Sequence, residues 1–216
     1  MFCRLLELLP SWFLINSSRS QVEATLRSLL RMAVFFEMDD MGDYAFNTLG
    51  SLPGLSPVVQ LEVGLLHDIE EWIHAGFRRL VIQVPIQRLQ LADFDVVGLR
   101  VFFVLAQTQA DVELYRRQVC YGVPKMVYSA RCPFNAGCRI SWKQEWWGGF
   151  AKHLLNPDPL VPRQTPQGLL TKLFDVDISY LCTECKKLTI QAALDHPACN
   201  GEDQIINLGV KRLGQL

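Results

Sequence analysis

Cysteine and histidine recur at metal-ligand spacing in the second half of the chain. Two residues separate Cys182 from Cys185, ten residues follow, and His196 and Cys199 repeat the two-residue spacing. Two soft ligands at this spacing hold one side of a tetrahedral Zn²⁺, and a second pair completes the shell. Any zinc bound by this pattern would be structural, because protein side chains would fill all four positions.

A second set of four ligands competes for the first of these pairs. Cys132 and Cys138, with five residues between them, can join Cys182 and Cys185 and leave the histidine unused. This spacing is looser than usual for a zinc site. Against the first set, residues 189–194 have a helical pattern that could carry His196 and Cys199 away from the other pair. A third interpretation is that no metal binds, since free cysteine is among the most buried residue types. The metal ligands stay open at this point, and we predict no other cofactor.

Catalysis by a cysteine is a different chemistry that the same residue types allow. A nucleophilic cysteine needs a thiolate, a basic partner and an oxyanion donor, and the chain has 7 Cys and 4 His. No glycine motif flanks any of them, and there is no phosphate-binding loop, dinucleotide fingerprint or HExxH motif. The acidic residues of 37–43 are explained by a helix start, whose dipole they complement. We predict that the protein is not an enzyme and has no catalytic residues.

The elements of the first half are predicted to be short helices. Ser56 followed by Pro57 is a helix start, because the first helical position does not need an N–H group. Asp68 and Glu71 have the spacing of a capping box, and Pro85 argues against a strand at 81–86. Apolar residues recur at helical spacing in these segments: 20–34 after Ser18 or Ser20, 39–49, 57–65, 69–80, 89–98 and 97–117.

The second half is richer in cysteine, tryptophan and proline. Residues 121–137 are predicted to form a loop, and Ser141 is predicted to open a helix. That helix carries an apolar ridge at every fourth position: Trp142, Trp146, Phe150 and Leu154. Four prolines make 156–166 a rigid connector, and two helices follow, at 165–173 and 201–213.

Length and composition fit a globular, mostly α-helical protein. The chain has 216 residues, of which 50% are hydrophobic and 20% charged, which excludes disordered and collagen-like proteins. We predict a multi-helix bundle of packed helix pairs with a Cys/Trp-containing helical C-terminal half. The predicted domains are residues 1–118 and 119–216.

Charge and cysteine usage bear on partners and compartment. The net charge of −1 provides no strong field for nucleic acid or an anionic membrane, so we expect neither as a partner. No run approaches the ~20 apolar residues of a membrane span. The cysteine count is odd, and no clear cleavage site follows the apolar residues 1–15, which predicts an intracellular protein, in cytoplasm or nucleus, with reduced thiols.

Several segments carry a family resemblance. They are 29–46 (LLRMAVFFEMDDMGDYAF), 55–62 (LSPVVQLE), 71–80 (EWIHAGFRRL) and 91–99. These segments are similar to the helices that follow the BTB fold in BTB/POZ-domain proteins of mushroom-type fungi. Cys132, Cys138, Trp142 and Trp146, with the LLNP of 154–157, resemble the C-terminal region of that family. Residues 1–10 resemble the last helix of the BTB fold itself.

The resemblance implies a chain that lacks most of a BTB domain. Apolar residues near its start would then need a cover: Phe2, Leu5, Leu6, Trp12 and Phe13. We therefore expect a non-catalytic protein–protein interaction protein, a scaffold or adaptor fragment, with a protein partner or self-association. The alternative is a zinc-stabilised regulatory or nucleic-acid-binding module that uses the cysteines of 182–199 and the basic pair at 211–212.

Overall fold

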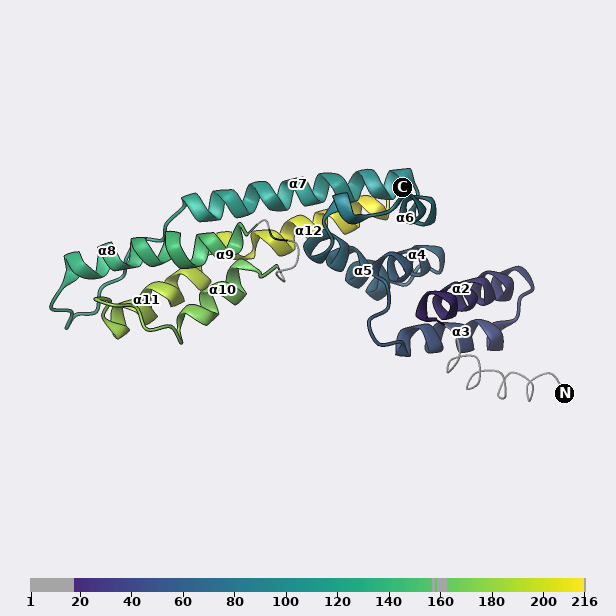
Figure 1. Ribbon diagram of the computed structural model, residues 1–216, viewed down its shortest axis with the longest axis horizontal. Helices are drawn as coiled ribbons and strands as arrows, with labels where there is room; N and C mark the ends of the chain where they lie inside the picture. Colours follow the sequence, from purple (N-terminus) through teal and green to yellow (C-terminus); the bar gives the residue numbers. More distant parts are fainter. Residues whose placement is uncertain (1–17, 157, 159–162, 216) are drawn as a thin grey trace. The chain divides into compact units, whose positions relative to one another are not determined.

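The computed structural model describes residues 18–156, 158 and 163–215 (Figure 1). These residues are mostly α-helical and contain no strand, so the predicted fold class, a multi-helix bundle, is confirmed. The apolar residues expected at 2–13 and the helix expected at 1–10 lie outside the described residues. Part of the predicted connector, residues 157 and 159–162, lies outside them as well.

The chain divides into two compact units, unit 1 (Met1–Gly76) and unit 2 (Phe77–Leu216). The boundary expected between residues 118 and 119 instead falls within a single helix, α7 (Leu99–Tyr121). That helix packs against α12 (Gly201–Leu213). Because α7 packs against α12 within unit 2, the boundary between the two units cannot lie inside α7. It lies earlier in the sequence, between Gly76 and Phe77.

Unit 1 is built on a pair of packed helices, α2 (Arg19–Phe35) and α3 (Asp39–Ser51). The next helix, α4 (Pro57–Leu66), begins at the predicted proline. Its buried Glu62 accepts a hydrogen bond from Arg31 of α2 at 2.5 Å and forms an ion pair with Arg27 at the same distance. The core is formed by side chains spaced as an apolar stripe requires: Val22, Leu26, Leu30, Ala45, Leu49, Leu55, Val59 and Val63.

The helix α5 (Glu70–Gln83) starts in unit 1 and approaches α4 closely. A Cβ atom at Gly76 would lie 2.7 Å from the backbone nitrogen of Leu61, so only glycine allows this approach. The predicted capping box at Asp68 is not formed. The carbonyl of Ile69 accepts the first helical N–H groups, and Asp68 precedes it with φ of 54°.

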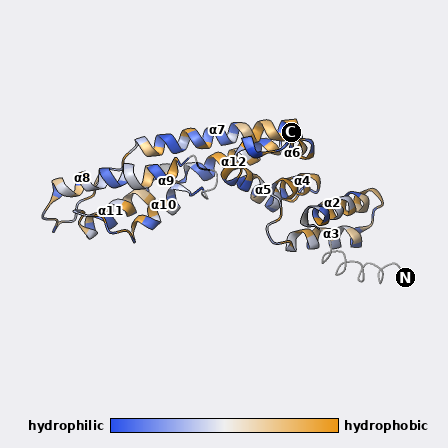
Figure 2. Ribbon diagram, viewed as in Figure 1, coloured by the Kyte–Doolittle hydropathy of each residue, from blue (hydrophilic) through white to orange (hydrophobic). Residues whose placement is uncertain are grey.

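Unit 2 contains the remaining elements in chain order. They are the 3₁₀ turn η1 (Ile86–Arg88), α6 (Leu91–Val97), α7, α8 (Asn135–Glu145), the π-helical η2 (Trp146–Ala151), α9 (Lys152–Leu154), α10 (Pro166–Leu173), α11 (Thr183–Leu194), η3 (Pro197–Asn200) and α12. Apolar and polar residues alternate along α7 and α12, as one-sided packing requires (Figure 2). Among the described helices, none is both long and apolar enough to cross a bilayer.

The predicted tryptophan ridge lies in the core of unit 2. Trp146 stacks on Phe150 with ring centroids 4.1 Å apart, and its indole donates to the carbonyl of Cys120 at 2.8 Å. The helix begins at Asn135, six residues before the predicted start. Ser141 is buried inside the helix. Serine favours helix starts, but packing overrides that preference here.

Candidate metal centre

Three thiol groups of unit 2 come together in the structure. The sulfur atoms of Cys132, Cys138 and Cys185 all lie within 4.8 Å of one another. The Sγ atoms of Cys132 and Cys138 are 3.5 Å apart. The backbone N–H of Cys182 donates to the Sγ of Cys138 at 3.4 Å. The second of the two ligand sets considered from the sequence is therefore the one that the fold assembles.

The distance between the sulfurs of Cys132 and Cys138 fits a shared tetrahedral metal rather than a disulfide. Zn–S bonds of about 2.3 Å in a tetrahedron place sulfurs about 3.8 Å apart, close to the 3.5 Å between Cys132 and Cys138. A disulfide would require about 2.05 Å between the same atoms. Thiolates are soft ligands, and a set of four of them favours Zn²⁺ over Mg²⁺ or Ca²⁺.

Cys182 is the fourth cysteine of this set. It is the N-cap of α11 and is half-buried, three residues before Cys185. It is near enough to Cys132 and Cys185 to influence the pKa of both thiols. Its sulfur lies outside the group of three, so a metal ion at the centre would draw this side chain inward.

Two helix starts position the four cysteines. Cys138 lies in the first turns of α8, which begins at Asn135, and Cys185 lies in the first turn of α11. The partly positive N-terminal ends of both helices therefore face the same cluster of sulfur atoms. Helix N-termini favour the thiolate form, and hence the anionic charge that four thiolates and one Zn²⁺ would carry together, whereas burial favours the thiol form.

Backbone N–H groups point at the sulfur atoms. The N–H of Phe134 lowers the pKa of Cys132, and the N–H of Ser129 donates to the Sγ of Cys185 at 3.2 Å. Burial raises the pKa of Cys138 and raises that of Cys185 to about 12. Because a metal ligand must be deprotonated, binding would release protons from these buried thiols.

Two side chains of α11 fix the loops that carry the cysteines. The buried Lys186 donates its ammonium to the carbonyls of Phe174 and Val176, at 2.8 and 2.6 Å. Thr189 accepts from the N–H of Val127 at 3.0 Å. The first contact holds the chain before Cys182, and the second holds the chain before Cys132. These positioning residues were not identified from the sequence, since a lysine next to a cysteine resembles an ordinary surface residue.

The first ligand set is not assembled. Cys185 and His196 lie at opposite ends of α11, whose 12 residues span about 18 Å. Cys199 lies in the apolar core beside Trp146 and Ile190, where burial raises its pKa, and His196 is exposed. Within the described part of the chain, no imidazole joins the thiol cluster.

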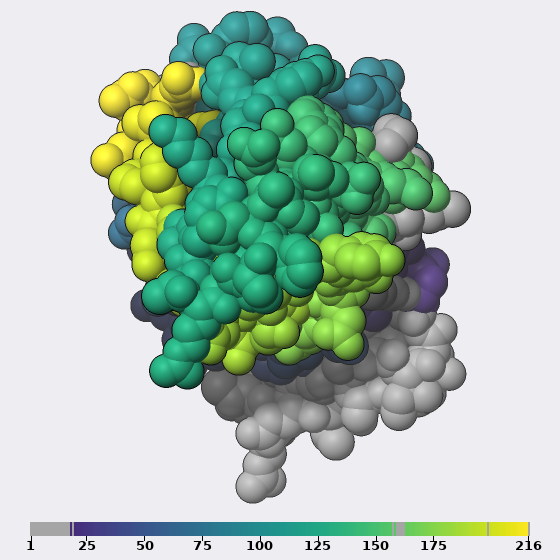
Figure 3. All heavy atoms as spheres, turned by 90° about the vertical axis from the view of Figure 1, so that its left-hand side faces the viewer, coloured from purple at the N-terminus to yellow at the C-terminus, as the bar shows by residue number. Residues whose placement is uncertain are grey.

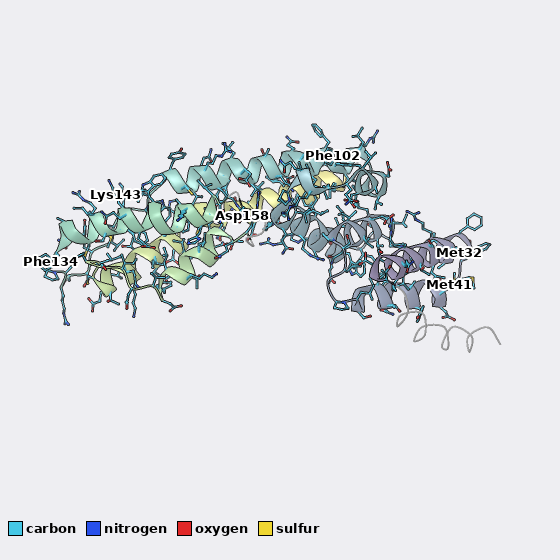
Figure 4. All side chains as sticks on the ribbon, in the orientation of Figure 1. Met32, Met41, Phe102, Phe134, Lys143 and Asp158 are labelled. Atoms are coloured by element: carbon cyan, nitrogen blue, oxygen red, sulfur yellow. The ribbon has the colours of Figure 1, made fainter. Side chains whose placement is uncertain are left out.

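The cluster lies at one end of unit 2. Figure 3 views this end, where the chain entering α8 and the start of α11 reach the surface. Figure 4 labels Phe134 at the tip of the loop into α8. Its side chain is 73% exposed, and that of Tyr180, next to the other cysteine pair, is 89% exposed. Exposed aromatic side chains thus flank the candidate metal centre.

Comparisons with known proteins found no family model, no curated protein and no solved structure that matches this chain.

Proposed function

We propose that the chain is a zinc-stabilised, non-catalytic interaction protein, in which one Zn²⁺ bound by Cys132, Cys138, Cys182 and Cys185 holds a surface for a protein partner. The observation that carries the proposal is the meeting of three thiols from two separate parts of the sequence, with the backbone N–H of Cys182 bonded to one of them. Chance burial of cysteine does not account for sulfur atoms that face one another at the starts of two helices.

The metal in this proposal has a structural role. Four thiolates leave no open coordination position, and catalytic zinc requires one for water or substrate. The metal instead links the start of α8 at Asn135 to the start of α11 at Thr183, which are 48 residues apart along the chain. Loops with little apolar core of their own gain their order from such a link.

The interaction role is supported by the exposed aromatic residues in the loops that carry the cysteines. Tyr180 has a φ of 62°, an uncommon backbone conformation for a non-glycine residue, and its ring stands in solvent. Phe134 is exposed between two of the cysteines. Exposed aromatic residues on rigid loops are typical of binding surfaces. The resemblance to the helices that follow a BTB fold supports the adaptor role, and reduced thiols fit cytoplasm or nucleus.

The first test is the metal content of the full chain, purified without chelator. We expect one zinc per chain by elemental mass spectrometry, and loss of that zinc in Cys132→Ser and in Cys185→Ser. The matched control is His196→Ala, which removes an exposed residue of the rival ligand set and retains the zinc. A chain without zinc, zinc lost with His196, or a Cys132–Cys138 disulfide detected by mass would contradict the proposal.

The second test concerns the displayed surface. The double substitution Phe134→Ser/Tyr180→Ser leaves all four ligands in place, so zinc content and helical circular dichroism should not change. We expect proteins captured from cell extract by the zinc-loaded chain to be lost with the double variant. Identical captured proteins for the two chains would contradict a binding role for these residues.

A further inference from the structure

Unit 2 also contains a cleft, and none of the candidate metal ligands lines it. Its volume is about 680 Å³, and it lies among α7, the turn η1 and the chain on either side of residues 157–162. Binding sites for ligands the size of a short peptide segment or a drug occupy about 300–1,000 Å³. The cleft is therefore large enough for several side chains of a partner.

The cleft is held open by hydrogen bonds within the fold. The side-chain amide of Gln109 on α7 donates to the carbonyls of Leu80 and Val84, at 2.8 and 2.7 Å. Its oxygen accepts from the N–H of Ile86 at 3.2 Å. These three bonds fix η1 against α7. A ligand would meet a formed wall, which lowers the entropic cost of binding.

The cleft carries an excess of positive charge. Four arginine residues line it: Arg88, Arg116, Arg117 and Arg163. Two are already paired, Arg163 with Glu113 and the buried Arg116 with Glu202. Arg88 and Arg117 are exposed, and among the described residues neither pairs with a carboxylate. Guanidinium groups in this state bind carboxylate or phosphate oxygens in a forked geometry.

Apolar side chains accompany these charges. Ile86, Leu154 and Leu155 also line the cleft. A single small oxyanion would leave these apolar groups and most of the volume unused. A glutamate side chain matches both features of the cleft. Its carboxylate can bind an arginine, and its methylene groups can contact the apolar wall.

We propose that this cleft binds an acidic segment of a partner protein, whose carboxylate or phosphate groups accept hydrogen bonds from Arg88 and Arg117. The proposal rests on the interaction role proposed above and does not depend on the metal. Charge complementarity, a formed wall and an apolar lining together favour a peptide as the occupant.

The experiment measures binding of fluorescent peptides to the full chain by anisotropy, with the zinc content of each sample determined. The probes are hexaglutamate, a phosphoserine peptide, hexaglutamine, inorganic phosphate as competitor and a single-stranded oligonucleotide. The test variant is Arg88→Gln/Arg117→Gln. Its control is Arg100→Gln, which neutralises an exposed arginine of α7 that does not line the cleft.

We expect hexaglutamate or the phosphoserine peptide to bind, hexaglutamine not to bind, and added salt to weaken the complex. The double variant should weaken binding about tenfold or more, and Arg100→Gln should not. The inference is overturned if neither acidic peptide binds, if both variants lose affinity equally, if phosphate alone competes at the same concentration as peptide, or if the oligonucleotide binds more tightly. If the peptides fail to bind to a chain with normal zinc content, the cleft proposal is contradicted and the proposed metal centre is not.

Discussion

The buried ion pair between Arg116 and Glu202 provides a sharp test of how unit 2 is packed. The two side chains are only 2% and 3% exposed, and two N–O distances of 3.1 Å join them in a forked arrangement. Arg116 also reaches the carbonyl of Gln164 at 3.5 Å. Removal of one partner leaves the other charge buried without compensation, which costs about 3–5 kcal/mol of unfolding free energy.

The pair is best tested with a double-mutant cycle. We expect Arg116→Met and Glu202→Leu each to lower the free energy of unfolding by about 3–5 kcal/mol, and the double variant to lower it by about 0–2 kcal/mol, because apolar side chains replace both charges. Arg212→Met is the matched control. It breaks a half-exposed pair with Asp111 at 3.8 Å and should cost at most about 1 kcal/mol.

Urea denaturation followed by tryptophan fluorescence measures these differences, because Trp142 and Trp146 are buried in the same unit. The m-value must stay constant for the free energies to be compared. The reasoning is refuted if the double variant loses as much stability as the two single variants combined. A single-variant loss as small as that of Arg212→Met would refute it equally.

Three other predictions test the close contact at Gly76, the loops that carry the cysteines and the titration of a half-buried phenol. Gly76→Ala should lower the unfolding free energy by about 1–3 kcal/mol through overpacking, because its Cβ would lie 2.7 Å from backbone; Gly148→Ala, with nothing within 4 Å, should not, and equal melting temperatures would contradict the contact. Lys186→Met leaves two carbonyls without their donor and should weaken zinc binding about 10–100-fold in a chelator competition; unchanged affinity would show that the loop does not depend on this lysine. Burial raises the pKa of Tyr115 from 10.0 to about 12, so between these pH values the unfolded chain loses a proton that the folded chain keeps, and the unfolding free energy falls as pH rises. Urea titrations over this range should show a shallower fall for Tyr115→Phe, and the same slope in both chains would count against the assignment.

Much of the fold was predictable because local signals and packing agree. Pro57 starts α4 as expected, and the four-residue spacing of the tryptophan ridge places Trp146 and Phe150 in the core. The errors have physical causes. Ser141 and Asp68 are good capping residues by type, but burial of the first and the backbone conformation of the second move the helix starts elsewhere.

The candidate site was only partly predictable. The sequence supplied two ligand sets, and spacing alone favoured the one with His196. The choice depends on α11, which places Cys199 in the apolar core and leaves Cys185 beside Cys138. The spacing within one segment does not show which cysteines from a distant segment will pack near it in the fold. For the same reason, the excess positive charge of the cleft could not be predicted from the sequence.

The pairing of α7 with α12 has a consequence for how the protein is made. Arg116 and Glu202 lie 86 residues apart in sequence. During translation, α12 can therefore cover its side of α7 only after residue 213 has been synthesised. The helices of unit 1 contact near neighbours in sequence and can form while synthesis continues. Without α12, α7 still packs against α6 and η2, but the side that α12 covers stays exposed, and exposed apolar surface of this kind makes a nascent chain prone to aggregate. A chain truncated before α12 would keep that side exposed.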